Sequence, residues 1–282
     1  MSKELQVKTG LGRGVAWSSI CATALFFSSP VRAQDAQELA RITKSMPSDA
    51  QTVIERLGEL DHLPAGEWRF HAGDVPHGES VDLDDSSWQT VKPGFESSGE
   101  SAWYRRWVEV PKTLHGYDLT DTRIWFRFVA NANGPMPQII YFNGSRVALG
   151  DDLEPIVLLD HAKPGQKVLI AVKIMQTVDK KHFHNAEFKI DFAESRPNPD
   201  DLRKEFLSAA VLVPSLSKNT QGDEATLDKS IATVDLKALD ASDQQKFDAS
   251  LKQSTSELEA LKPLLQEGTF HLTGNSHIGA TI

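Results

Sequence analysis

The sequence contains only one cysteine, Cys21, among its 282 residues. An intrachain disulfide is therefore excluded, and a folded chain must rely on its hydrophobic core. The sequence also lacks a Gly-rich phosphate loop, a nucleophilic serine elbow and a paired Cys/His pattern, which are signatures of several large enzyme classes. Hydrophobic residues make up 40% of the chain, enough for a real core in one or two domains, so global disorder is excluded.

The sequence has fewer basic than acidic residues. The chain has 30 Lys and Arg against 39 Asp and Glu, a formal net charge of −9. Removing residues 1–33, which carry four basic groups and one acidic group, leaves a formal charge of −12. This balance argues against nucleic acid or an anionic membrane as a partner and is compatible with a neutral ligand such as a sugar.

The first 33 residues have the pattern of an export signal. Lys3, Lys8 and Arg13 give a basic start, residues 14–27 are mostly apolar, and Val31-Arg32-Ala33 predicts cleavage after Ala33. The apolar run is short for a membrane span, although an uncleaved N-terminal anchor is the alternative. We expect a periplasmic or secreted protein that has no membrane contact after cleavage and no cysteine left.

From residue 67 to residue 192 the hydrophobic period is two, as in half-buried strands. The alternating apolar sets are Ile124, Phe126 and Phe128; Val168, Ile170, Val172 and Ile174; and Phe188, Ile190 and Phe192. Asn143-Gly144 is a typical type I′ hairpin dipeptide, and Pro164-Gly165 marks another turn. About eight strands without long helices indicate an antiparallel β-sandwich.

Helical patterns flank this strand region. Val53, Ile54 and Leu57 line one face of the segment at 35–61, where Ser48 and Gln51 fit a capping box. We expect a helical hairpin there that packs on the sandwich. After residue 196 we expect one helix capped by Asp200 and Asp201 and stopped by Pro214, and a second capping box at Ser242 and Gln245. Apolar helical positions recur at Leu227, Ile231, Val234, Phe247, Leu251, Leu258, Leu261 and Leu265.

Several motifs of the strand region resemble the galactose-binding-like jelly roll of many glycoside hydrolases. They are Asp84-Asp85-Ser86-Ser87-Trp88, Trp103-Tyr104-Arg105-Arg106, Arg123–Phe128, Tyr141-Phe142-Asn143-Gly144 and Lys163-Pro164-Gly165. The resemblance covers about 45% of the chain by its motif span and implies a jelly-roll sandwich. It does not fix a ligand, because this fold serves many functions.

Three clusters inside the sandwich region could carry chemistry. Asp82, Asp84 and Asp85 could hold calcium, although they fail the EF-hand spacing and could equally cap a turn before Trp88. His182 and His184 at strand spacing would face the same way as half of a metal site, although Lys180 and Lys181 beside them would repel a cation. The alternative is a solvated loop tip that enters the last strand.

The third cluster contains Trp103, Tyr104 and Trp107. Alternation places Trp103 and Trp107 on one face of a strand and Tyr104 on the other. The exposed face could stack on sugars, but aromatic residues at strand spacing are more often part of a core.

The last stretch, Thr269–His277, is an apolar strand pattern that ends on small polar residues and a histidine. It resembles the opening of the catalytic domain of glycoside hydrolase family 38, the α-mannosidases, which begins with a strand followed by His-x-Asp. The resemblance implies that His277 stands where the family places a zinc ligand. Gly279 replaces the expected Asp, so we expect zinc in the full-length parent and none held by this fragment.

Together these observations predict a mainly β protein: an antiparallel jelly-roll sandwich flanked by N-terminal and C-terminal helices, ending in the first strand of a missing α/β catalytic barrel. The predicted parts are a signal peptide at 1–33, a helical lead-in at 34–61, the sandwich at 62–196, a helical linker at 197–267 and a truncated catalytic start at 268–282. The expected function is the inactive front portion of an exported α-mannosidase-like enzyme whose parent would bind and hydrolyse α-mannosides. A stand-alone carbohydrate-binding sandwich is the alternative.

Overall fold

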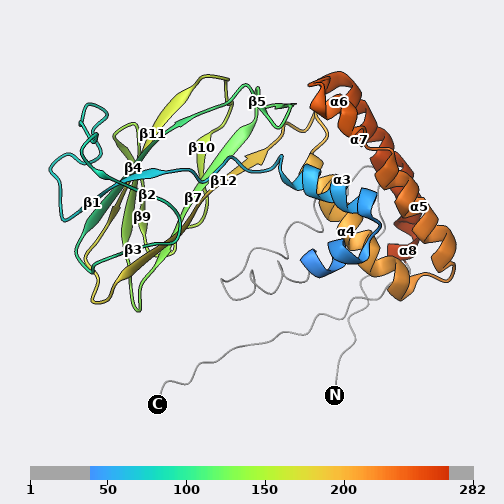
Figure 1. Cartoon of the computed structure of the whole chain (residues 1–282), viewed down its shortest axis with the longest axis horizontal. Helices are drawn as coiled ribbons and strands as arrows, with labels where there is room; N and C mark the ends of the chain where they lie inside the picture. The colour runs from blue at the N-terminus through green and yellow to red at the C-terminus, as the bar shows by residue number, and fades with distance from the viewer. Residues whose placement is uncertain (1–38, 267–282) are drawn as a thin grey trace, which may run out of the picture. The chain divides into compact units, whose positions relative to one another are not determined.

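The computed structural model describes residues 39–266, without the side chains of the last two. The chain divides into two compact units, Met1–Ser45 and Met46–Ile282. In the first unit, residues 39–45 form a helical turn in which the Thr43 hydroxyl donates to the carbonyl of Leu39. The second unit contains an antiparallel two-sheet sandwich and a set of helices (Figure 1).

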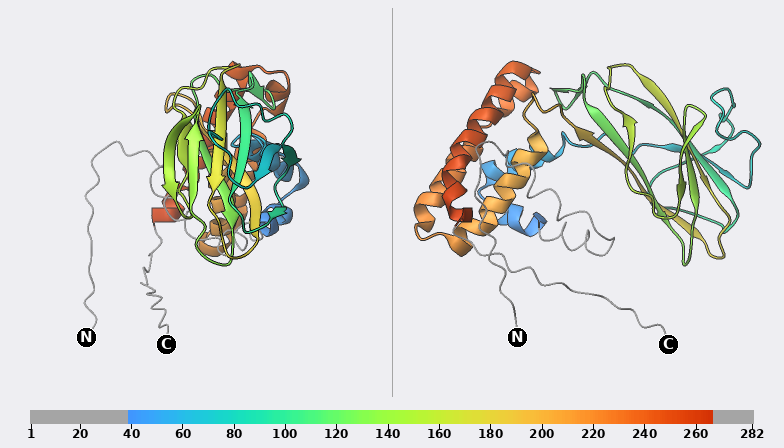
Figure 2. Two further views of the ribbon diagram at one scale, coloured as in Figure 1. Left: turned by 90° about the vertical axis from the view of Figure 1, so that its left-hand side faces the viewer. Right: turned by 180° about the vertical axis from the view of Figure 1, so that it is seen from behind.

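Six strands form the larger sheet, in the spatial order β2-β1-β4-β11-β8-β9. Their bounds are β1 Trp68–Ala72, β2 Gln89–Val91, β4 Ala102–Glu109, β8 Gln138–Phe142, β9 Ser145–Gly150 and β11 Lys167–Ile174. The smaller sheet has the order β10-β7-β12-β3, with β3 Phe95–Ser97, β7 Arg123–Asn131, β10 Ile156–Leu159 and β12 Lys181–Asp191. A separate hairpin pairs β5 Thr113–Leu114 with β6 Tyr117–Asp118. Figure 2 shows the strands from two further sides.

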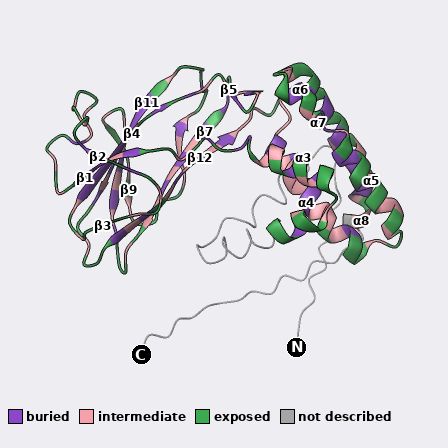
Figure 3. Cartoon of the chain, viewed as in Figure 1, coloured by how far each residue is buried: buried purple, intermediate pink, exposed green. Residues whose placement is uncertain are grey.

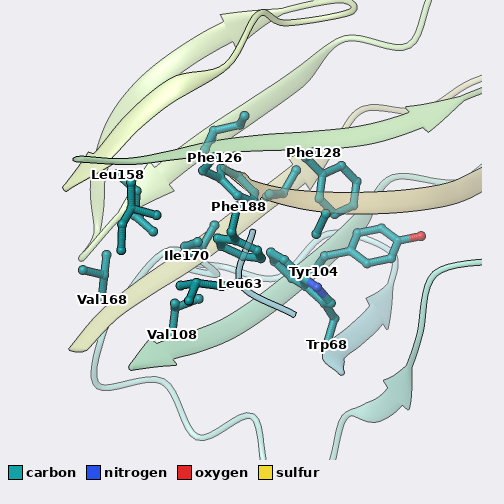
Figure 4. Close-up of a cluster of buried hydrophobic side chains, with 14 of the residues drawn as sticks. Leu63, Trp68, Tyr104, Val108, Phe126, Phe128, Leu158, Val168, Ile170 and Phe188 are labelled. Atoms are coloured by element: carbon teal, nitrogen blue, oxygen red, sulfur yellow. The ribbon is translucent and has the colours of Figure 1, made fainter. Parts of the chain in front are cut away.

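The core lies between the two sheets, as the sequence alternation predicts. Ile124 and Phe126 of β7 are fully buried, and so are Ile170 of β11 and Phe188 of β12. Figure 4 shows these side chains converging from both sheets around Trp68. Burial follows every second residue over most of β7 and β12 (Figure 3), which agrees with the sandwich expected from the period-two pattern.

The predicted hairpin turn is confirmed by its backbone. Asn143 and Gly144 connect β8 to β9 and have φ values of 48° and 82°. A type I′ turn needs positive φ at both central residues, which Asn and Gly tolerate better than other residues.

Helices make up about as much of the described chain as strands do, so the expectation of a mainly β fold is wrong. They are α3 Ser48–Gly58, α4 Pro199–Leu216, α5 Thr220–Ala232, α6 Leu236–Asp240, α7 Gln244–Leu258, the 3-10 turn Glu259–Leu261 and α8 Lys262–Gln266. Helix α3 packs on α4 and α5 rather than on the sandwich as expected. Its buried face contains Val53, Ile54 and Leu57, as the pattern predicted.

The predicted helix starts are wrong by a few residues. Asn198, rather than Asp200 or Asp201, caps α4, because its side chain accepts from the backbone N–H of Asp200. Helix α4 also continues through Pro214 to Leu216. Side-chain caps compete over neighbouring Asx and Ser positions, so sequence spacing alone does not decide between them.

The two predicted capping boxes, at Ser48 and Ser242, also do not cap their helices as expected. Helix α3 follows Pro47 and has no side-chain cap, and Ser48 is its first residue. Asp243, rather than Ser242, caps α7 by accepting from the N–H of Lys246.

The β5–β6 hairpin attaches the sandwich to α7. Tyr117 is fully buried, and its hydroxyl donates either to Asp248 Oδ1 at 2.9 Å or to the Pro197 carbonyl at 3.1 Å. Its ring packs edge-on against Phe247. Gly116 has a φ of 95°, and an added Cβ would lie 2.2 Å from the Leu239 carbonyl oxygen, so only glycine fits this contact.

Candidate functional site

The outer face of the six-stranded sheet is covered by one long connection, residues 73–88, which we call the cover loop. Beneath it, Trp88, Trp103 and Ala171 form a second hydrophobic cluster, joined by the partly buried Val75, Leu83 and Tyr141. Gly78 lies against the Trp103 ring so closely that a Cβ would approach it to 2.5 Å. The first half of β4 and most of β11 are therefore buried on both faces, which the period-two reading of the sequence did not anticipate.

Arg105 fastens the cover loop to the sheet. Its side chain is 1% exposed and forms an ion pair with Asp85 at 2.8 Å. The guanidinium also donates to the carbonyls of Gly78 and Ser80, at 2.5 and 2.9 Å, and more weakly to that of Leu83 at 3.4 Å. A planar guanidinium with five N–H donors suits a set of carbonyls that converge in this way.

The aspartates of this loop act as loop-fastening groups. Asp84 accepts from the backbone N–H of Ser86 at 2.9 Å, which forms an Asx turn. Hydrogen bonding from the Ser86 side chain, and then from its backbone N–H, lowers the pKa of the Asp84 carboxyl. Asp85 is occupied by Arg105, and Trp88 enters the second cluster. The expected alternative, a turn that precedes a buried Trp88, describes this geometry, and the calcium hypothesis finds no support in it.

The three aromatic residues of β4 divide as alternation predicts. Tyr104 is fully buried in the main core, against Phe70, Phe128 and Phe183, and burial raises the pKa of its hydroxyl to about 12. Trp103 is on the opposite face but is buried by the cover loop. Its indole N–H donates to Asp74 at 3.3 Å. Trp107 alone of the three remains half exposed, at 50%.

Trp107 is the candidate ligand-contacting side chain on this face. It lies opposite Leu169 of β11, which is fully buried and whose backbone pairs with Asn143. Farther along the same two strands, Lys167 and Glu109 form an ion pair at 3.1 Å. An exposed indole near an exposed Lys–Glu pair has the composition of a surface that can stack on a small polar ring and hydrogen-bond to its edge.

The His182 and His184 side chains do face the same way, as predicted from their spacing. Their rings lie 6.0 Å apart at an interplanar angle of 12°. They lie near the start of β12, on either side of the buried Phe183, and both are accessible to solvent. The alternative, a solvated loop tip that enters the last strand, is therefore right about solvent and wrong about the loop. His182 Nδ1 is 3.4 Å from a carboxylate oxygen of Glu96 on β3, and His184 Nε2 is 3.0 Å from Asn131 Oδ1 on β7.

Lys181, expected to repel a cation beside these histidines, points the other way. Its side chain is fully buried and its Nζ has no hydrogen-bond partner among the described residues. It lies across from Ser97 of β3. Burial lowers the pKa of the Lys181 ammonium, partly offset by the Glu100 carboxylate.

A second unusual ionisable group is in the helical part. Glu205 of α4 is partly buried, and Asp201 and Glu259 add negative charge beside it. Burial and these two carboxylates raise the pKa of Glu205 to about 7. A separate hollow of about 1070 Å³ lies between α3 and the end of α5. Its lining includes Val53 of α3, Ile231 of α5 and Val234, which follows α5.

His277, the zinc ligand implied by the family 38 resemblance, lies outside the described residues, as does the predicted first strand of a barrel. The predicted export signal lies outside them too. Within residues 39–266, no cluster of three or more His, Cys, Asp or Glu side chains is arranged to hold a metal ion. No helix in the same range is long and apolar enough to cross a membrane.

Two features of the site were missed by sequence reasoning. Arg105 occupies the outward-facing register of β4, which predicts exposure, and only the cover loop makes it buried. Glu96 is far from His182 in sequence and becomes its neighbour through the pairing of β3 with β12. For Lys181 a signal existed, because it shares the parity of the inward-facing Phe183.

Comparison with known proteins shows a distant resemblance to family 2 glycoside hydrolases. A glycosyl hydrolase family 2 member from Bacteroides cellulosilyticus is 20% identical, over 46% of this chain and 20% of that chain, with a TM-score of 0.36. A calcium-binding mutant of Bacteroides uniformis beta-glucuronidase 2 is 16% identical over 45% of this chain and 17% of that chain, with a TM-score of 0.35. A beta-glycosidase from Bacteroides vulgatus is 16% identical over 44% of this chain and 19% of that chain, with a TM-score of 0.33.

These matches are partial and limited to part of the fold. They span about a fifth of the length of those enzymes. No known protein family and no curated protein matches the sequence. The family 38 resemblance of residues 269–277 finds no support in these comparisons.

Proposed function

We propose that this chain is a non-catalytic, carbohydrate-binding part of a glycoside hydrolase-like protein, with Trp107 as its sugar-stacking residue. The observation that carries the proposal is the exposure of Trp107. The neighbouring large aromatic on the same face, Trp103, is buried, whereas the Trp107 indole is left half exposed beside a fixed ion pair. About half of the Trp107 surface faces solvent, where the flat ring can stack on a sugar ring.

The parent enzyme in this proposal is exported, and its α-mannosidase character rests on the pattern of residues 269–277 alone. Zinc would belong to that parent, where His277 would be one ligand among three or four. Within residues 39–266 no three His, Cys, Asp or Glu side chains are arranged as a metal site, so we propose that the described part performs no zinc-dependent hydrolysis.

A glycan array followed by isothermal titration with the best-binding oligosaccharide tests the proposal. We expect Trp107→Ala to weaken binding at least tenfold while leaving the thermal unfolding midpoint nearly unchanged. Trp125→Ala is the matched control, because Trp125 is a partly exposed indole on the other sheet, and it should leave binding intact. Equal losses in both variants, or sugar binding that Trp107→Ala leaves intact, would refute the assignment.

A second candidate function, a structural spacer between domains, is favoured by the attachment of the β5–β6 hairpin to α7. The Tyr117 hydroxyl is within hydrogen-bond distance of both Asp248 and the Pro197 carbonyl, and Gln244 accepts from the backbone N–H of Asp118. Such a junction fixes the sandwich against the helices. A glycan array on which the intact protein binds nothing would favour this function over carbohydrate binding.

A further inference from the structure

The histidine pair on the four-stranded sheet lies away from the proposed sugar surface, at two outward-facing positions of β12. The register of β12 shifts directly after Phe183, so the regular alternation that places both histidines outward ends at this pair. The two rings are nearly parallel and 6.0 Å apart. Both side chains are accessible to solvent: His182 is 44% exposed, and His184 is exposed.

Each ring has an oxygen partner at one nitrogen. His182 Nδ1 is 3.4 Å from the Glu96 carboxylate, and His184 Nε2 is 3.0 Å from the Asn131 side-chain oxygen. An oxygen at one ring nitrogen favours the tautomer with the proton there and leaves a lone pair on the other nitrogen. Metal-binding histidines commonly have such a partner, which orients the ring and raises its basicity.

We propose that His182 and His184 bind a divalent transition-metal ion, of the class of Cu²⁺, Ni²⁺ or Zn²⁺. Imidazole nitrogen is the ligand that these ions favour, at about 2.0–2.1 Å for zinc. The two rings are nearly parallel with centroids 6.0 Å apart, so each must turn about its side-chain bonds before one nitrogen of each can reach a shared ion. Because residues 39–266 hold no complete cluster of three ligands, water completes the coordination.

The electrostatic surroundings favour a cation. Glu96 contributes a carboxylate beside His182, and Lys181 turns its amine into the core on the opposite face of the strand. Glu96 therefore acts as a positioning residue for the His182 ring. The site is independent of the proposed sugar contact, because Trp107 belongs to the other sheet.

The test is isothermal titration of the full-length, chelator-treated protein with copper, nickel and zinc chlorides. We expect one ion bound, with affinity reduced at least tenfold in His182→Ala and in His184→Ala and lost in the double variant. Glu96→Gln should weaken binding less than either histidine variant does. Thermal unfolding of each variant verifies the fold, since both rings are at the surface.

Two controls make the result specific. His161→Ala removes an exposed histidine that also pairs with an aspartate, Asp121 at 2.7 Å, and should leave the affinity unchanged. His277→Ala tests the C-terminal stretch and should also leave it unchanged. The proposal is overturned if the double variant binds as the unmodified protein does, if the unmodified protein binds none of the three ions, or if His277→Ala alone abolishes binding.

Discussion

The sandwich buries two cations in different ways. Arg105, under the cover loop, has a carboxylate and three carbonyls as partners. Lys181, on the inner face of the other sheet, has no hydrogen-bond partner among the described residues. Both side chains are almost completely removed from solvent, at 1% and 0% exposure.

The difference shows that burial alone does not say whether a charge stabilises a fold. A buried charge that is paired and hydrogen-bonded holds its surroundings in place, and removing it leaves its partners uncompensated. A buried ammonium without partners carries a desolvation cost that folding does not recover. Arg105 is therefore expected to stabilise the fold, and Lys181 to reduce its stability.

The largest effect is expected from Arg105→Met. The substitution keeps much of the side-chain volume but leaves Asp85 and three loop carbonyls without their donor, so we expect a loss of about 3–5 kcal/mol in unfolding free energy. Urea unfolding measures it. Arg146→Met, at an exposed position of β9, is the control and should change stability little. A loss below about 1 kcal/mol would show that the cover loop does not depend on Arg105.

Lys181→Met should have the opposite sign, a gain of about 1–2 kcal/mol, because an apolar side chain of similar length replaces an unpaired buried amine. The exposed Lys180→Met is its control. Since the folded pKa lies below the usual 10.5, the unfolded chain binds more protons between those two values. Stability of the unmodified protein should therefore rise with pH across that window, and the rise should be smaller in the variant. Destabilisation would reveal a partner for the amine.

The smallest effect concerns Glu205, which extends the comparison to a partly buried acidic side chain. Its pKa of about 7 lies above the usual 4.5, so the folded state binds more protons and stability should fall as pH rises from about 4.5 to about 7. Glu205→Gln should remove this dependence and add about 1 kcal/mol at pH 8. The exposed Glu55→Gln should leave the pH profile unchanged. A profile that stays the same in Glu205→Gln would disprove the assignment.

The sequence predicted the sandwich well because strand alternation is a local property. Phe126 and Phe188 face inward for the same reason that their neighbours face outward. The cover loop could not be predicted in this way, because it is held by contacts between residues 20 or more positions apart, such as Asp85 and Arg105. Helix packing was also missed, since α3 has an apolar face but the sequence does not say against what it lies.

The candidate sites show the same difference between features set by local spacing and features set by contacts between distant residues. The common direction of His182 and His184 followed from their spacing, but Glu96 became a neighbour only through the pairing of β3 with β12. The exposure of Trp107 and the burial of Trp103 depend on how far the cover loop extends, which their shared strand parity does not determine. The domain boundaries and the export signal stay predictions.

The lengths of the outermost strands have a consequence for self-association. Each sheet ends in strands whose backbone groups could pair with another chain, and long, flat edges of this kind promote aggregation. Here β2 and β3 have three residues each and β10 has four, while the pairing of the longer β9 is interrupted by an irregular register. These edges offer few continuous hydrogen-bonding positions, so the sandwich is protected against stacking edge to edge at high concentration.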